Sequence, residues 1–248
     1  MAKDLFSNQA VAYAQYRPVY PNELFEYIFS FVPHRSLAWD CATGNGQAAV
    51  VLSQYFAKVY ATDISEKQLQ QAIPMSNIIY AVGSAEKTSL PANSFDLVTV
   101  AQAYHWFNFE AFKQEVLRVA KNEAIVAVWG YSLIQCEDEP VTSLLKSFYV
   151  DVAGPYWDKE RKYVDEEYTT VAFPYEELPS RSFKIKVSWR KWEVLGYLNT
   201  WSGIQHFIKA NGYNPVDNFA EQLQQVWPHN NPKLFHFPVF LRLGKVHK

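Results

Sequence analysis

A glycine loop preceded by an acid is the first feature of the sequence that could bind a ligand. The stretch WDCATGNGQAA holds Gly44 and Gly46 shortly after the acid Asp40. Glycines at a turn from a strand into a helix let the backbone approach a ligand, and the first helical turn offers N–H groups without a partner. A second acid, Asp63, lies about 20 residues further on, where a carboxylate can hold ribose hydroxyls. The spacing predicts a nucleotide site.

Two kinds of nucleotide compete for this loop. GNGQAA fits the dinucleotide fingerprint, so NAD is a viable ligand. Asp40 argues against NAD, because a carboxylate beside the glycine turn repels a pyrophosphate at close range. S-adenosylmethionine has no phosphate and carries an ammonium and a sulfonium, so the same acid attracts it. Asp40 therefore favours S-adenosylmethionine, although an ordinary strand-end carboxylate would also explain this residue.

Alternating strand and helix patterns would position the loop. Strands are expected at 36–40, 58–63, 77–85, 94–102, 124–130, 182–191 and 233–246. Helices are expected at 7–16, 21–32, 47–55, 65–73, 107–120 and 140–153, and across 192–227. Such alternation predicts an α/β fold whose ligands bind at the carboxyl ends of parallel strands.

No linker, repeat or low-complexity segment divides the chain, so residues 1–248 are predicted to form a single domain. Its expected parts are an N-terminal helical arm or lid at 1–32, a cofactor-binding core at 33–131, cap insertions at 132–180 and 192–227, and the last strands at 182–191 and 233–246.

Composition and charge limit the class of function. The formal net charge of −2 gives no basic field for a phosphate backbone, so nucleic acid is not an expected partner. The two cysteines lack metal-ligand spacing, and no metal site is predicted. No run approaches the length of a membrane span and the start has no signal-like apolar stretch, so we expect a cytoplasmic protein without membrane contact. The sequence gives no indication of the oligomeric state.

The chain resembles the class I S-adenosylmethionine-dependent methyltransferases. The residues that carry this resemblance are AWDCATGNG, YATD, GSAEKTSLPANSFDLVTVAQAYHWF and FKQEVLRVAKNEAIVAVWG. FSNQAVAYAQYRPVYP and YLNTWSGIQHF look like the type 11 subgroup that includes trans-aconitate methyltransferase. The resemblance implies a Rossmann-like sheet of seven mostly parallel strands with an antiparallel last strand, helices on both faces and a helical cap.

One residue departs from the family pattern. Ala42 stands where the motif D-x-G-x-G-x-G has its first glycine. We expect only a small shift of the loop, because alanine tolerates ordinary backbone angles.

The resemblance also implies roles for individual residues. The cofactor-binding set is Asp40, Ala42, Thr43, Gly44 and Gly46 toward the methionine part, Asp63 on the ribose, Ile64, Ser84, Ala85 and Glu86 around adenine, and Gln102 and Ala103 near the methyl group. The candidates for catalysis or acceptor binding are Tyr16, Arg17, His105 and Trp106.

The expected acceptor is a small organic molecule. Transfer from a sulfonium needs mainly the alignment of donor and acceptor in a dry pocket, so no catalytic triad or metal is required. The resemblance suggests a carboxylate held by Arg17, which would leave His105 without a base role. A hydroxyl or amine acceptor would give His105 that role. An NAD-linked oxidoreductase and a non-catalytic binding protein with the same fold remain the competing hypotheses.

Overall fold

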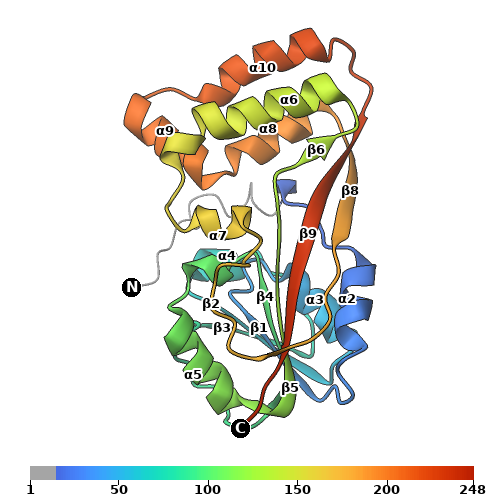
Figure 1. Ribbon diagram of the computed structural model, residues 1–248, viewed down its shortest axis with the longest axis vertical. Coiled ribbons are helices and arrows are strands. Elements are labelled where there is room, and N and C mark those ends of the chain that lie inside the picture. Colours follow the sequence, from blue (N-terminus) through green and yellow to red (C-terminus); the bar gives the residue numbers. More distant parts are fainter. Residues whose placement is uncertain (1–14) are drawn as a thin grey trace.

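A single mixed sheet runs through the computed structural model, which describes residues 15–248 (Figure 1). The strands are β1 (Leu37–Cys41), β2 (Lys58–Asp63), β3 (Ile78–Val82), β4 (Phe95–Ala101), β5 (Ala120–Tyr131), β6 (Gln135–Cys136), β7 (Glu176–Glu177), β8 (Phe183–Trp189) and β9 (Lys233–Lys245). Strands β3, β2, β1, β4 and β5 are parallel neighbours in that order, and β9 joins β5 antiparallel. Strands β6, β7 and β8 each pair antiparallel with β9.

The Rossmann-like sheet with an antiparallel last strand is therefore confirmed. β1 to β5, β8 and β9 correspond to the seven expected strands, with ends that differ by a few residues. β6 and β7 have two residues each and are additions that the sequence does not predict. Strands this short have no periodicity to recognise, and their pairing with β9 depends on the tertiary fold.

Helices fill the connections between the strands. They are α2 (Asn22–Phe29), α3 (Gln47–Ser53), α4 (Glu66–Leu69), α5 (Phe109–Val119), α6 (Glu139–Ser147), α7 (Arg161–Asp165), α8 (Lys191–Asn199), α9 (Ser202–Asn211) and α10 (Pro215–Val226). The Ser65 Oγ caps α4 by accepting a hydrogen bond from the Gln68 amide at 3.3 Å, but α4 is shorter than the expected helix at 65–73. Of the helix expected at 7–16, residues 7–14 lie outside the described residues.

Apolar side chains cover both faces of the sheet. Helices α2 and α3 pack on one face and α5 packs on the other (Figure 1). Along β4 and β5 successive residues alternate between the two core clusters, so that Leu97 and Ile125 belong to one and Val98 and Val126 to the other. Buried on both faces, these strands are nearly continuous in apolar residues.

Four helices gather at one end of the sheet, beyond the carboxyl ends of the parallel strands (Figure 1). α10 packs on α6 and α8, α9 packs on α8 and α10, and we refer to these four helices as the cap. The short helix α7 lies between the cap and the sheet (Figure 1). No helix within residues 15–248 is long and apolar enough to cross a bilayer.

Candidate active site

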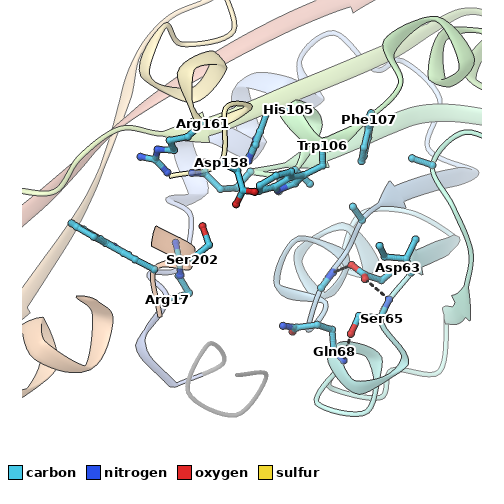
Figure 2. Close-up of a pocket in the computed structure, with 18 of the residues that line it drawn as sticks. Arg17, Asp63, Ser65, Gln68, His105, Trp106, Phe107, Asp158, Arg161 and Ser202 are labelled. Atoms are coloured by element: carbon cyan, nitrogen blue, oxygen red, sulfur yellow. Dashed lines mark hydrogen bonds between the residues drawn. The ribbon is translucent and has the colours of Figure 1, made fainter. Parts of the chain in front are cut away.

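A pocket lies between the carboxyl ends of the parallel strands and the cap (Figure 2). Eleven of the sixteen residues that the sequence singles out line it. They are Arg17, Ala42, Gly44, Asp63, Ile64, Ala85, Glu86, Gln102, Ala103, His105 and Trp106. The other five, Tyr16, Asp40, Thr43, Gly46 and Ser84, are not on its surface. Within residues 15–248 no group of three or more acidic, histidine or cysteine side chains could hold a metal ion.

The Asp63 carboxylate fixes the glycine loop to the end of β2. Its Oδ2 accepts the Gly44 amide at 2.8 Å and its Oδ1 accepts the Ser65 amide at the same distance. Figure 2 shows Asp63 and Ser65 side by side on the wall opposite Arg17 and Ser202. Asp63 thus borders the pocket and also shapes the loop beside it.

The loop needs left-handed backbone angles at three positions. Gly44 has φ +57° and Gly46 has φ +83°, in the region that glycine adopts without strain. A Cβ on Gly46 would lie 2.5 Å from the Tyr80 hydroxyl, whereas a Cβ on Gly44 would meet no atom of residues 15–248 within 4 Å, apart from its neighbours in the chain. The space above Gly44 therefore suits a ligand that approaches the backbone.

Ala42 also has a left-handed backbone, with φ +54°. The expectation that alanine keeps ordinary backbone angles here is wrong. The next residue, Thr43, donates its amide to the Thr62 carbonyl of the neighbouring strand at 2.9 Å, and this bond fixes the course of the turn. The glycine of the family pattern is thus replaced by a residue that strains the backbone.

Replacing Ala42 with glycine should relieve this strain. We expect Ala42→Gly to raise the free energy of unfolding by about 1 kcal/mol, because a left-handed alanine costs roughly 1–2 kcal/mol and part of that gain is offset by the more flexible unfolded chain. For a chain of this size the melting temperature should rise by about 2–4 °C. Thermal unfolding without ligand measures the change, and an unchanged or lower melting temperature would contradict it.

Asp40 lies behind the pocket wall and is almost fully buried, with 1% of its surface exposed. Its carboxylate accepts the Thr43 hydroxyl at 2.5 Å and the Thr99 hydroxyl at 2.7 Å. Burial raises the pKa of Asp40 to about 6, and the nearby Asp63 adds to this, although the two threonine bonds oppose the shift. Asp40 is therefore a charge held next to the loop and not a residue of the pocket surface.

A cationic ligand at the loop should be linked to the protonation of Asp40. A nearby ammonium lowers the pKa of this carboxyl, so binding below pH 6 must release a proton. We expect the affinity for S-adenosylmethionine to rise as the pH increases from about 5 to about 7 and to level off above that. Calorimetric titrations across this range would measure it. In Asp40→Asn the rise should be absent, and an equally steep rise in that variant would contradict the assignment.

The residues expected around an adenine ring lie on one side of the pocket. Ile64, which is 36% exposed, and Ala85 and Glu86 line it. Ser84 does not line it, and its hydroxyl donates to the Glu86 carboxylate. Glu86 also accepts the Asn108 amide at 3.1 Å, so its side chain is oriented by its neighbours.

The turn after β4 brings residues 102–106 to the pocket. Gln102 has a left-handed backbone, with φ +54°, and its Oε1 accepts the Tyr131 amide at 2.7 Å. The chain then forms a 3₁₀ turn over Tyr104–Trp106. Ala103, His105 and Trp106 line the pocket, whereas Tyr104 is buried beneath it.

The His105 imidazole is 6% exposed, and its Nδ1 lies 2.8 Å from the Tyr168 hydroxyl. Burial lowers the pKa of His105 to about 3, and the positive charge of Arg161 contributes to the same shift. The ring is therefore neutral at physiological pH and accepts a proton poorly.

The N-terminal arm reaches the pocket through Arg17. Its Nη1 donates to the Tyr131 hydroxyl at 2.6 Å and its Nη2 to the Thr200 carbonyl at 3.2 Å. Tyr16 packs edge-on against Trp192, with ring centroids 6.3 Å apart, and does not line the pocket. Arg17 thus tethers the arm to the strand β5 and to the cap.

Several pocket residues are ones that the sequence does not single out as site residues. Two of them are Trp157 and Trp201, and the remaining nine are Ser65, Gln68, Gly83, Ala101, Phe107, Asp158, Arg161, Tyr197 and Ser202. Four of these nine come from the cap, from α7 or from the segment just before α7. The aromatic and charged composition of 156–165 is a signal, but no local pattern shows which of its side chains face the pocket.

Arg161 is held firmly by its surroundings. Its Nε donates to the Tyr149 hydroxyl at 2.9 Å and lies 3.3 Å from the Asp165 carboxylate. The guanidinium also lies over the Trp157 ring, 5.0 Å from the centroid. Neither Nη1 nor Nη2 donates a hydrogen bond to any residue from 15 to 248, and neither is sealed from solvent. Both amino groups are available to a ligand.

Proteins similar to this chain are methyltransferases by name. Residues 39–128 match the family model described as a methyltransferase domain. A protein from Dictyostelium discoideum, named as a methyltransferase, is 33% identical over 249 residues, which span 98% of this chain and 95% of the relative. A second relative, from Saccharomyces cerevisiae and named as an S-adenosylmethionine-dependent methyltransferase, is 30% identical over 56% of this chain and 52% of its own length.

Solved structures agree with these relatives. A structure named as a type II methyltransferase from Anaeromyxobacter dehalogenans has a TM-score of 0.85 and 34% identity, and covers 93% of this chain and 98% of that one. A Haemonchus contortus N-methyltransferase solved with phosphomonomethylethanolamine and S-adenosylhomocysteine has a TM-score of 0.52 at 15% identity, over 97% of this chain and 59% of that one, and shares the fold.

Proposed function

Because the chain belongs to the S-adenosylmethionine-dependent methyltransferases, we propose that it methylates a carboxylate of a small organic molecule that is bound by Arg161. The observation that carries this proposal is the pair of unpartnered amino groups of Arg161 at the pocket, within the part of the chain that the structure describes. A planar guanidinium whose two free amino groups share one edge matches a carboxylate in a two-point hydrogen bond.

The charge at the acceptor end of the pocket supports an anion. Burial lowers the pKa of Arg161, but Tyr149 and Asp165 raise it by more, so the guanidinium stays charged. Arg17 lies on the same side (Figure 2), and Asp158 is the acid that lines the pocket there. The sequence resemblance assigned the carboxylate to Arg17, but both terminal nitrogens of Arg17 already donate to the protein. Arg161 is the better candidate.

The neutral His105 also fits a carboxylate better than a hydroxyl or an amine. A hydroxyl or amine acceptor must lose a proton, and the low pKa of His105 makes it a poor base. A carboxylate is already ionised at neutral pH. The sequence resemblance to the trans-aconitate methyltransferase-like subgroup supports the same acceptor class.

The residues around the glycine loop fit S-adenosylmethionine. The open space above Gly44, the Asp63 carboxylate and the exposed Ile64 would face its methionine, ribose and adenine parts, with the buried Asp40 near its positive charges. When bound, the cofactor would supply a methyl group on a sulfonium; a carboxylate oxygen can attack the methyl carbon in line and give a methyl ester, with S-adenosylhomocysteine as the leaving group. The role of the protein in this step is alignment. Arg161 orients the carboxylate, and Trp106, Trp157 and Trp201 exclude water.

A substrate panel tests this proposal. The purified protein is incubated with S-adenosylmethionine and a set of small carboxylic acids, phenols and amines, and the release of S-adenosylhomocysteine is measured. We expect turnover with carboxylic acids and a product that mild base hydrolyses to methanol, as a methyl ester requires. Turnover of phenols or amines alone would overturn the carboxylate assignment, and no turnover of any compound would contradict a small-molecule acceptor.

A further inference from the structure

A buried tyrosine from the segment after α7 contacts His105 on the side away from the pocket. The Tyr168 hydroxyl lies 2.8 Å from the His105 Nδ1, and the Tyr168 side chain is fully buried. The two residues are 63 positions apart. Which ring nitrogen of a histidine carries the proton is set by the partner of the other nitrogen, so this contact decides what His105 offers to the pocket.

The surroundings of the Tyr168 oxygen determine the direction of the bond. Burial raises the pKa of Tyr168, so the phenol keeps its proton. Within residues 15–248 the His105 Nδ1 is the one acceptor within hydrogen-bond distance of this hydroxyl, so the buried phenol proton is satisfied only if Tyr168 donates to it.

The other ring nitrogen of His105 is directed to the pocket. Nε2 makes no hydrogen bond to any residue from 15 to 248, and it is not among the polar atoms sealed from solvent. We propose that Tyr168 is a positioning residue that donates to the His105 Nδ1, and so holds the tautomer in which Nε2–H faces the pocket as a hydrogen-bond donor to the methyl acceptor.

The backbone at Tyr168 is strained, and contacts with the rest of the fold hold it in place. Glu167 and Tyr168 have φ +52° and +58°, which side-chain-bearing residues rarely adopt in succession. Arg242 donates to the Tyr168 carbonyl at 2.7 Å, and the Tyr168 ring packs edge-on against Phe240, 5.1 Å away. Strained backbone of this kind persists where the surrounding structure over-determines it, often near functional groups.

The inference rests on the proposed function for the identity of the acceptor, since an N–H donor suits a carboxylate oxygen and not a group that must be deprotonated. The tautomer itself does not depend on the acceptor. It can therefore be tested separately from the substrate panel.

Nitrogen NMR of the protein labelled in its six histidines measures the tautomer directly. His105→Gln identifies the His105 signals by their loss. We expect Nδ1 at the position of an unprotonated nitrogen and Nε2 at that of a protonated one. In Tyr168→Phe both signals should move toward the average of exchanging tautomers. A wild-type His105 protonated on Nδ1, or a tautomer unchanged in Tyr168→Phe, would overturn the proposal and leave the carboxylate assignment intact.

Kinetics separate positioning from a merely structural role. Tyr168→Phe should lower kcat by about tenfold, because the correct tautomer is then only partly populated. The side-chain amide introduced by His105→Gln would keep an N–H near the same place without a tautomer. In the His105→Gln background, Tyr168→Phe should therefore change kcat by less than about twofold. An equal loss in both backgrounds would contradict the inference.

Tyr104→Phe is the matched control. It removes a buried hydroxyl of the same cluster, one that donates to the Ala172 carbonyl at 2.9 Å and not to His105. We expect it to leave the His105 tautomer and kcat unchanged. If it shifts both as much as Tyr168→Phe does, the effect comes from the packing of the cluster and the proposal is wrong.

Discussion

Arg161→Met should reduce kcat/KM for a carboxylate acceptor by about 10²–10³-fold. Two charge-assisted hydrogen bonds of roughly 1.5–3 kcal/mol each are lost, part of which water recovers in the open pocket. Most of the loss should appear in KM, since the contact is made in the ground state as well as in the transition state. Steady-state kinetics with the best acid of the panel would measure it. Arg161→Lys should recover only part of the activity, because an ammonium keeps the positive charge but cannot form the two parallel hydrogen bonds of a guanidinium.

Lys162→Met is the matched control for this substitution. It removes the same charge from the adjacent position of α7, where the side chain is exposed and does not line the pocket. We expect its kinetics to match the wild type. The affinity of Arg161→Met for S-adenosylmethionine should also be unchanged, which shows that the variant is folded. Full activity in Arg161→Met, together with loss of activity in Arg17→Met, would contradict this assignment and indicate that Arg17 binds the carboxylate.

Asp63→Ala should weaken the binding of S-adenosylmethionine by about 2–3 kcal/mol, or roughly 30–150-fold, as hydrogen bonds between a carboxylate and ribose hydroxyls are lost. The variant should also unfold more easily without ligand. The Gly44 and Ser65 amides lose their acceptor, which we expect to cost roughly 1–3 kcal/mol. Calorimetric titration measures the affinity and denaturant unfolding the stability.

Asp63→Asn separates these two effects. The amide oxygen can still accept one of the two loop hydrogen bonds, so the stability should fall less than in Asp63→Ala. The affinity should nevertheless fall, because the charge is lost. Glu66→Ala, which removes an exposed acid three residues on, should change neither quantity. Unchanged affinity in both Asp63 variants would mean that this acid serves only the loop.

Local sequence patterns were enough to predict the sheet and the half of the pocket that belongs to it. Gly44, Asp63 and the turn from Gln102 to Trp106 are near the ends of buried apolar strands. The carboxyl ends of parallel strands meet at one edge, so strand patterns alone bring these residues together. The expected strand ends differ from the observed ones by a few residues. For each of these strands, however, the sequence predicted which end meets the pocket.

The angles within the loop depend on contacts beyond the local sequence. Nothing in the neighbouring residues requires Ala42 to be left-handed. This follows from the hydrogen bond between Thr43 and Thr62, which joins the turn to the neighbouring strand. The sequence correctly placed Asp40 beside the loop. It did not show that the carboxylate is buried behind the pocket wall, where it accepts a hydrogen bond from Thr99 of β4, a residue far away in the sequence.

The side chains that face the sheet from the cap could be identified only once the chain was folded. α7 has five residues, too few for a hydrophobic periodicity that would show its inward face, so the sequence could not single out Arg161. Tyr168 meets His105 only because the segment after α7 folds back over the turn that follows β4. Strands pair in a regular way, so the residues at their carboxyl ends lie along one edge of the sheet. The cap has no such regular pairing. Its side chains are positioned by contacts between segments that are distant in the sequence.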